Sequence, residues 1–199
     1  MILLMLSTLT CMLLSPINAL ASYFELSLSG SYSRTRYSDQ DYSVNEAANA
    51  GLAYRFFGYS AIEFGYSVGK TTSVRNSDVT IDSSTIIDKQ IETIDSEVYS
   101  VSWKQYLAGN RSSIIPFFKL GYAALKTGGD LEWTLKDGRV VVFNVPVETE
   151  ASGLAGLGLQ IAVSSRLHLS LAAVSVFPKF DISRYEDKLT YSAGLTLFF

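Results

Sequence analysis

The stretch that decides the fold lies at residues 48–68 and reads ANAGLAYRFFGYSAIEFGYSV. Every second residue is apolar from Ala48 to Phe56 and again from Ile62 to Val68, and residues 58–60 separate the two runs. Side chains alternate between the two faces of a strand, so this pattern indicates strands with one apolar face each. The short Gly-Tyr-Ser connection predicts that the two strands form a hairpin.

The same period of two recurs along most of the chain. Together with the first two runs it predicts eight strands of about 10 to 14 residues, long enough to cross a bilayer at a tilt. The runs lie at residues 24–32, 48–56, 62–68, 99–107, 114–124, 155–163, 167–173 and 191–199.

The connections between these runs alternate strictly in length. Such alternation predicts an antiparallel up-and-down meander of even strand number with both termini at the short-turn end, which is the arrangement of a closed transmembrane β-barrel. Closure leaves no unpaired sheet edge in lipid. The short connections are residues 58–60, 109–112 and 164–166, and the long ones are residues 37–45, 70–96, 127–148 and 178–187.

The two faces of the strands differ in a way that predicts the orientation of the barrel. The polar faces consist mainly of Ser, Gly, Ala and Thr with few charges, which suits the narrow interior of an eight-stranded barrel better than an aqueous exterior. We therefore expect the apolar faces, including Leu26, Leu52 and Leu195, to point outward to lipid. A soluble ligand-binding barrel is the alternative. Two aromatic girdles are expected, at Phe24, Phe56 and Phe199 and at Tyr32, Tyr99 and Tyr191.

Composition excludes several other classes of protein. The chain has 199 residues, of which 48% are hydrophobic and 13% aromatic, so it is not a disordered chain. A net charge of -3 without a Lys/Arg cluster excludes an ordinary nucleic-acid surface. After residue 21 no apolar stretch approaches the ~20 residues of a membrane-spanning helix.

The first 21 residues differ from the rest and resemble a secretory leader. An apolar run is followed by Ser15-Pro16 and by Ala19-Leu20-Ala21, a pattern that signal peptidase accepts, although no Lys or Arg precedes the run. We predict a signal peptide at 1–21 and a barrel domain at 22–199. Cys11, the only cysteine, lies in the leader. The chain also has a single histidine, so neither a metal site nor a cofactor is expected.

The last eight residues, SAGLTLFF at 192–199, carry a family resemblance. Their alternation, their glycine and their terminal Phe resemble the C-terminal signal of outer-membrane barrels, and the chain resembles the small eight-stranded family typified by the OmpA membrane domain and OmpX. This resemblance implies a monomeric, non-enzymatic protein in the lipids of the outer membrane of a Gram-negative cell. It also implies that the barrel-assembly machinery reads Gly194, Leu197 and Phe199.

Five charged residues of the polar faces lie near short turns and are expected to share one layer of the lumen. Opposite charges in a dry space must pair and form hydrogen bonds, so they predict an ion-pair network that plugs the barrel. A small gated channel is the alternative. The five residues are Glu25, Arg55, Glu63, Lys104 and Lys119.

His168 and Ser170 offer a second alternative, because a His-x-Ser pair is similar to that of the lipid A deacylase barrels. In that family the pair faces lipid and a Glu on the next strand completes the site. Here the pair is predicted to point into the lumen beside a short turn, so we expect no enzyme. A lipid A-modifying enzyme that uses His168 and Ser170 stays an alternative.

A second hairpin is predicted within the longest connection of the C-terminal half. Asp137-Gly138 joins a run that contains Trp133 to a run that contains Val140 and Val142. Asp-Gly between apolar runs is a strong hairpin signal. Either the hairpin rises above the membrane as a ribbon whose edge binds a partner by strand addition, or it folds over the barrel mouth. The predicted role is envelope structure, or adhesion to a host or cell-surface protein through long extracellular loops.

Overall fold

The computed structural model describes residues 24–38, 40–76, 79–82, 85–109, 112–181 and 189–199. The predicted leader lies outside these residues. Among the described residues, none belongs to a helix long and apolar enough to span a membrane. The strands are β1 (Phe24–Arg36), β2 (Tyr42–Phe57), β3 (Ser60–Arg75), β4 (Val79–Asp82), β5 (Thr85–Tyr106), β6 (Ile114–Leu135), β7 (Val140–Ala162), β8 (Leu167–Pro178) and β9 (Leu189–Phe198).

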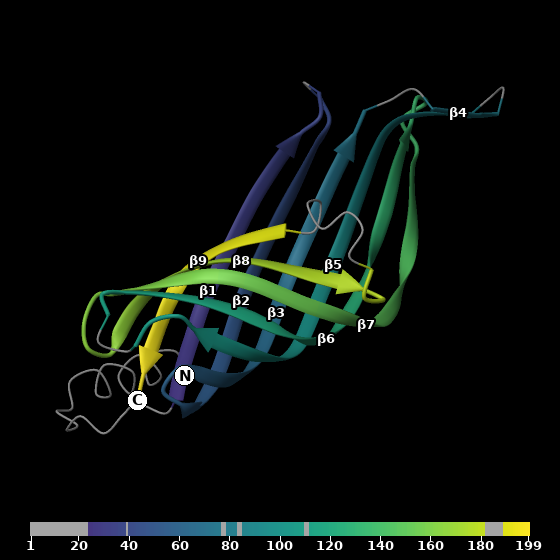
Figure 1. The fold of residues 1–199 in the computed structure, drawn as a ribbon. Coiled ribbons are helices and arrows are strands. Elements are labelled where there is room, and N and C mark those ends of the chain that lie inside the picture. Colours follow the sequence, from purple (N-terminus) through teal and green to yellow (C-terminus); the bar gives the residue numbers. More distant parts are fainter. Residues whose placement is uncertain (1–23, 39, 77–78, 83–84, 110–111, 182–188) are drawn as a thin grey trace, which may run out of the picture.

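Eight of these strands close into an antiparallel up-and-down barrel, which confirms the predicted fold class (Figure 1). Each strand pairs with the next one along the chain, β3 pairs directly with β5, and β1 pairs with β9 to complete the ring. At the closing seam Phe24 and Phe199 exchange backbone hydrogen bonds of 3.1 and 3.0 Å. The short β4 pairs with β5 outside the ring.

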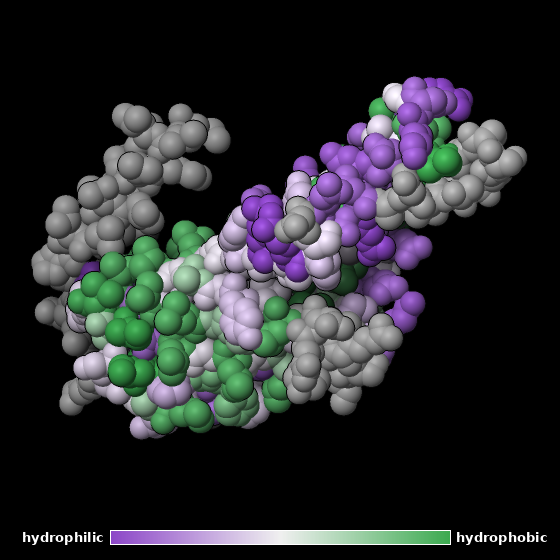
Figure 2. Space-filling model, turned by 90° about the horizontal axis from the view of Figure 1, so that it is seen from above, coloured by the Kyte–Doolittle hydropathy of each residue, from purple (hydrophilic) through white to green (hydrophobic). Residues whose placement is uncertain are grey.

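The side chains are oriented as the alternation predicts. Leu52 and Leu195 are 44% and 50% exposed, whereas Gln160 and Thr196 on the opposite faces are fully buried. Figure 2 shows hydrophobic side chains gathered over the barrel wall and hydrophilic ones over the part that rises from it. All six girdle aromatics are exposed. A closed barrel with an apolar outer wall and a polar interior crosses a lipid bilayer, and the soluble-barrel alternative is wrong.

The predicted strand lengths are wrong for the middle of the chain. β5, β6 and β7 have 22, 22 and 23 residues, and most of the connections predicted at 70–96 and 127–148 is strand, as are residues 42–45 of the connection predicted at 37–45. The apolar alternation stops where lipid contact stops, because both faces of a strand then meet water. The ladder of backbone hydrogen bonds does not depend on that alternation and continues upward.

The upper rim of the barrel is strongly uneven. β7 pairs with β6 up to Val140 but with β8 only from Ser152 onward, so β5, β6 and β7 stand above the β8 side. We call the upper parts of these three strands, residues 85–96, 127–135 and 140–150, the ribbon. Figure 1 shows it rising from the rim instead of folding across the barrel mouth. Of the two arrangements left open by the sequence, the structure has the ribbon.

Candidate functional site

Glu25 lies at the centre of a charged cluster in the lower lumen. This side chain of β1 is 1% exposed and forms an ion pair with Nε of Arg55 from β2. Its other carboxylate oxygen accepts a hydrogen bond from Nζ of Lys104 at 3.2 Å. Two cations and a shared carboxylate satisfy the requirement that a buried charge be paired.

Lys104 links this pair to a second carboxylate. Its Nζ also lies 3.2 Å from Glu63, which accepts a further hydrogen bond of 2.9 Å from Lys119. Lys104 is 3% exposed, whereas the side chain of Lys119 is 18% exposed. The structure thus brings all five predicted charges of the lumen into one connected network.

Two further members of the network were not among the predicted site residues. Tyr106 donates a hydrogen bond from its hydroxyl to Glu25, and its ring centroid lies 3.9 Å from Cζ of Arg55. Gln160 donates to Glu25 from the opposite wall at 3.5 Å. The sequence did carry a signal for Tyr106. This tyrosine lies two residues after Lys104, so the alternation of side chains along a strand places both on the inward face. Aromatic residues near strand ends are otherwise typical of the outer girdle.

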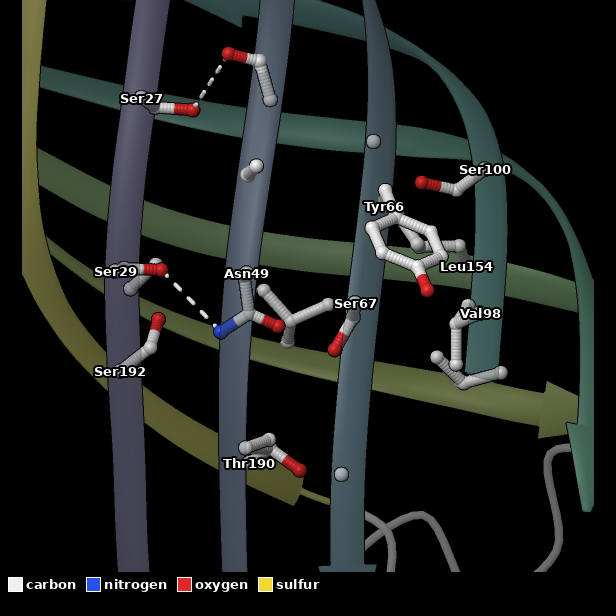
Figure 3. A pocket seen from close by; sticks show the side chains of 18 of the residues that line it. Ser27, Ser29, Asn49, Tyr66, Ser67, Val98, Ser100, Leu154, Thr190 and Ser192 are labelled. Atoms are coloured by element: carbon white, nitrogen blue, oxygen red, sulfur yellow. Dashed lines mark hydrogen bonds between the residues drawn. The ribbon is translucent and has the colours of Figure 1, made fainter. Parts of the chain in front are cut away.

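A chamber lies above the charged cluster. It has a volume of about 250 Å³, and Glu63, Lys104 and Lys119 are among its lining residues. Ser, Thr and Asn side chains of several strands line the rest together with apolar residues such as Val98 and Leu154, and Asn49 donates a hydrogen bond to Ser29 at 3.3 Å (Figure 3). The chamber therefore has a mixed lining of polar and apolar side chains, with the ion-pair network at one end.

His168 and Ser170 both lie on the lumen side of β8. His168 is 3% exposed, and its ring centroid is 4.5 Å from that of Phe198. Among the described residues, its Nδ1 has no hydrogen-bond partner. A carboxylate that orients the ring is what a hydrolytic triad needs, and none does so through this atom.

The tip of the ribbon is a tight turn at residues 136–139. The N–H of Gly138 donates to the carbonyl of Leu135 at 2.9 Å, and the N–H of Leu135 donates to the carbonyl of Arg139 at 2.8 Å. Gly138 has a φ of 86°, a conformation that costs glycine little. The backbone N–H and the guanidinium of Arg139 both donate to Asp137 and hold the pKa of that carboxyl below its usual value. The Asp-Gly hairpin is thus present as a β-turn with a bulge.

The ribbon is apolar on both of its faces near the outer edge. Val140 and Val142 are 55% and 60% exposed on one face. On the other face the rings of Trp133 and Phe143 meet edge to face, with centroids 4.7 Å apart. Exposed apolar side chains on both faces of a strand are typical of a contact surface.

One edge of the ribbon carries backbone groups that point outward. Among the described residues, no strand pairs with residues 140–149 on the side away from β6. The carbonyl of Arg139 bonds β6, so in the alternating antiparallel ladder Val141 and Phe143 also bond β6. The N–H and C=O groups of Val140, Val142 and Asn144 therefore point away from it. We call residues 140–144 the free edge.

The C-terminal residues of the predicted assembly signal lie at the closing seam. Phe199 is 53% exposed and stacks on Phe24 with ring centroids 6.0 Å apart. Leu197 pairs with Leu26, and Gly194 pairs with Ser29. A Cβ at Gly194 would overlap the carbonyl oxygen of Leu28, so this position requires glycine for steric reasons as well.

No protein-family model and no curated protein matches the sequence. Among solved structures, the fold resembles the N-terminal β-barrel domain of Pseudomonas aeruginosa OprF, with 8% identity, coverage of 88% of this chain and 97% of that chain, and a TM-score of 0.49. It also resembles Ail, the attachment invasion locus protein of Yersinia pestis, at 13% identity, 88% and 96% coverage and a TM-score of 0.44. Neisserial surface protein A matches at 13% identity, 89% and 98% coverage and a TM-score of 0.45.

Proposed function

We propose that this chain is a non-enzymatic protein of a Gram-negative outer membrane that holds a β-ribbon outside the cell and contacts surface proteins through it. The observation that carries this proposal is the free edge, because unpaired strand edges are normally covered or blocked. A partner that adds a strand would bond Val140, Val142 and Asn144 through its backbone. Valine side chains on the same edge would supply apolar contact.

The rest of the molecule suits an anchor for this edge. Backbone ladders bond the three strands of the ribbon to one another and keep the ribbon at a fixed place on the rim. Little conformational entropy is therefore lost when a partner binds. In the lumen, five charges pair with one another, and the rings of Tyr106, Phe117 and Phe198 pack on the cations. We infer that this network closes the barrel, since eight strands leave little space. The proposed partners inside the cell envelope are the outer-membrane lipids and the barrel-assembly machinery, and the proposed state is a monomer.

A single substitution tests strand addition at the free edge. Val142→Pro removes an outward N–H without breaking a bond to β6, because Val142 does not donate to β6. Bacteria that display the wild-type chain should adhere to a monolayer of cultured animal cells, and bacteria with Val142→Pro should adhere at the level of cells without the protein. The measurement is the count of bound bacteria.

The matched control is Val142→Ala, which keeps the N–H and removes only two methyl groups. It should retain most of the adhesion. Adhesion by Val142→Pro cells equal to wild type would reject strand addition at this edge. Equal adhesion by wild-type cells and cells without the protein would reject surface contact and leave a role in envelope structure.

A further inference from the structure

We infer that the free edge pairs with the free edge of a second copy of this chain in an opposing membrane, an inference that rests on the proposed role of the ribbon in contact. Antiparallel pairing of identical strands needs a two-fold axis that passes through a residue, because both strands present the same alternate N–H and C=O groups. Val140, Val142 and Asn144 are those residues. The axis must therefore be chosen among the positions near the middle of this segment.

An axis through Phe143 keeps Pro146 out of the interior of the overlap, and so does an axis through Val142. With the axis through Phe143, Val142 of each copy exchanges hydrogen bonds with Asn144 of the other, and Val140 donates to the carbonyl of Pro146. Proline has no N–H, and this axis places that missing donor at the last position of the overlap. An axis through Asn144 would place it directly opposite Val142, in the interior of the overlap.

Charge selects the axis through Phe143 between these two. Arg139 lies at one end of the apolar segment and Glu148 at the other. The register shift opposite residues 127–129 inserts one extra residue into β7, so Arg139 and Glu148 lie on the same face of the ribbon. Antiparallel pairing about Phe143 places Arg139 of one copy beside Glu148 of the other at both ends of the contact. Opposite charges at such cross-strand positions are favourable.

The direction of pairing decides where the second copy is. The ribbon rises from the barrel rim, so two copies in one membrane present strands that run in the same direction (Figure 1). Parallel pairing would place Arg139 beside Arg139 and Glu148 beside Glu148, which is repulsive. Copies in two facing membranes present antiparallel strands. The predicted contact therefore joins two membranes, and many weak contacts acting together strengthen it.

Crossed charge reversal tests the inference with the full chain reconstituted in phosphatidylcholine/phosphatidylglycerol vesicles. Wild-type vesicles should tether, as measured by light scattering and by co-flotation of two dyes. Vesicles with Arg139→Glu alone, or with Glu148→Lys alone, should tether about tenfold less, because like charges then meet at both ends. A mixture of the two variants should recover. At one end of the mixed contact the introduced carboxylate meets the introduced ammonium group, and at the other end the unchanged Glu148 of the first variant meets the unchanged Arg139 of the second.

Lys70 and Asp95 provide the matched control. They pair across β3 and β5, away from the free edge, so Lys70→Glu and Asp95→Lys make the same changes in net charge without touching the contact. Each of these should tether as wild type does. The inference is overturned if wild-type vesicles do not tether, if Arg139→Glu and Glu148→Lys tether like wild type, or if folded variants fail to recover when mixed. Adhesion to animal cells in the Val142→Pro experiment decides the proposed function independently.

Discussion

Lys104 is the residue on which the lumen network depends most. It contacts both buried carboxylates, whereas Lys119 contacts only Glu63 and is partly exposed. Removing one partner of a buried ion pair leaves a charge without compensation in a dry space. The loss of stability is therefore larger for a lysine that contacts more carboxylates and for carboxylates that water reaches less.

We predict that Lys104→Met lowers the free energy of unfolding by about 3–5 kcal/mol, the range for a broken buried ion pair. Lys119→Met should cost clearly less, because water partly reaches its site. Urea unfolding of the protein folded in lipid vesicles measures both. Equal losses for the two variants would contradict the central place given to Lys104.

Gly194 shows that one residue has a steric role at the closing seam. Alanine there would push its methyl group into the backbone of β1, whereas alanine at Gly30 would meet only the carbonyl oxygen of Ala47 at 3.8 Å. We predict that Gly194→Ala lowers the free energy of unfolding by about 1–3 kcal/mol or prevents refolding, as overpacking does. Gly30→Ala should refold with nearly wild-type stability. The shift between folded and heat-unfolded bands on a gel measures folding, and an unchanged Gly194→Ala protein would remove the steric argument.

At the scale of strands, sequence patterning predicted what lies in lipid and missed what lies above it. The runs around Leu52 and Leu195 were recognised because lipid selects apolar residues on one face only. The segment Thr71-Thr72-Ser73 belongs to β3, yet it is polar on both faces and has no period to detect. The charged cluster of the lumen was predictable because charged side chains on the inward faces of a narrow barrel must pair with one another. Tyr106 was missed because tyrosine is also common in the aromatic girdle on the outside of the barrel.

The ribbon should resist proteases along its strands and not at its tip. Ladder bonds hold both strands of the hairpin, and the exposed turn at residues 136–139 carries the trypsin sites Lys136 and Arg139. We predict that trypsin added to whole cells cuts the hairpin at one of these two residues before it cuts at Lys126, which lies within β6. Mass spectrometry of the fragments identifies the cut. Earlier cleavage at Lys126 would mean that the ribbon is not ordered as described.

At the scale of the whole molecule, the barrel separates two tasks along its axis. The lower lumen holds charges that need partners, and the tall side of the rim holds an edge whose backbone groups have none among the described strands. The same ladder connects them, because β5 and β6 run without interruption from the charged layer to the ribbon. A rigid lower barrel therefore fixes the position of the edge above it.

The ion-pair layer should also decide whether the lumen conducts. Glu25 and Glu63 are both held by Lys104, and the aromatic rings of Tyr106 and Phe117 pack on the same cation within 5.2 and 4.7 Å. Opening a path for ions would require these contacts to break in a narrow, poorly hydrated space. We predict that purified protein in planar bilayers gives no stable large conductance. Lys104→Ser should produce brief small openings because water then reaches the two carboxylates, and Lys126→Ser on the outer wall should not. Stable large conductance from the wild-type protein would reject the closed lumen.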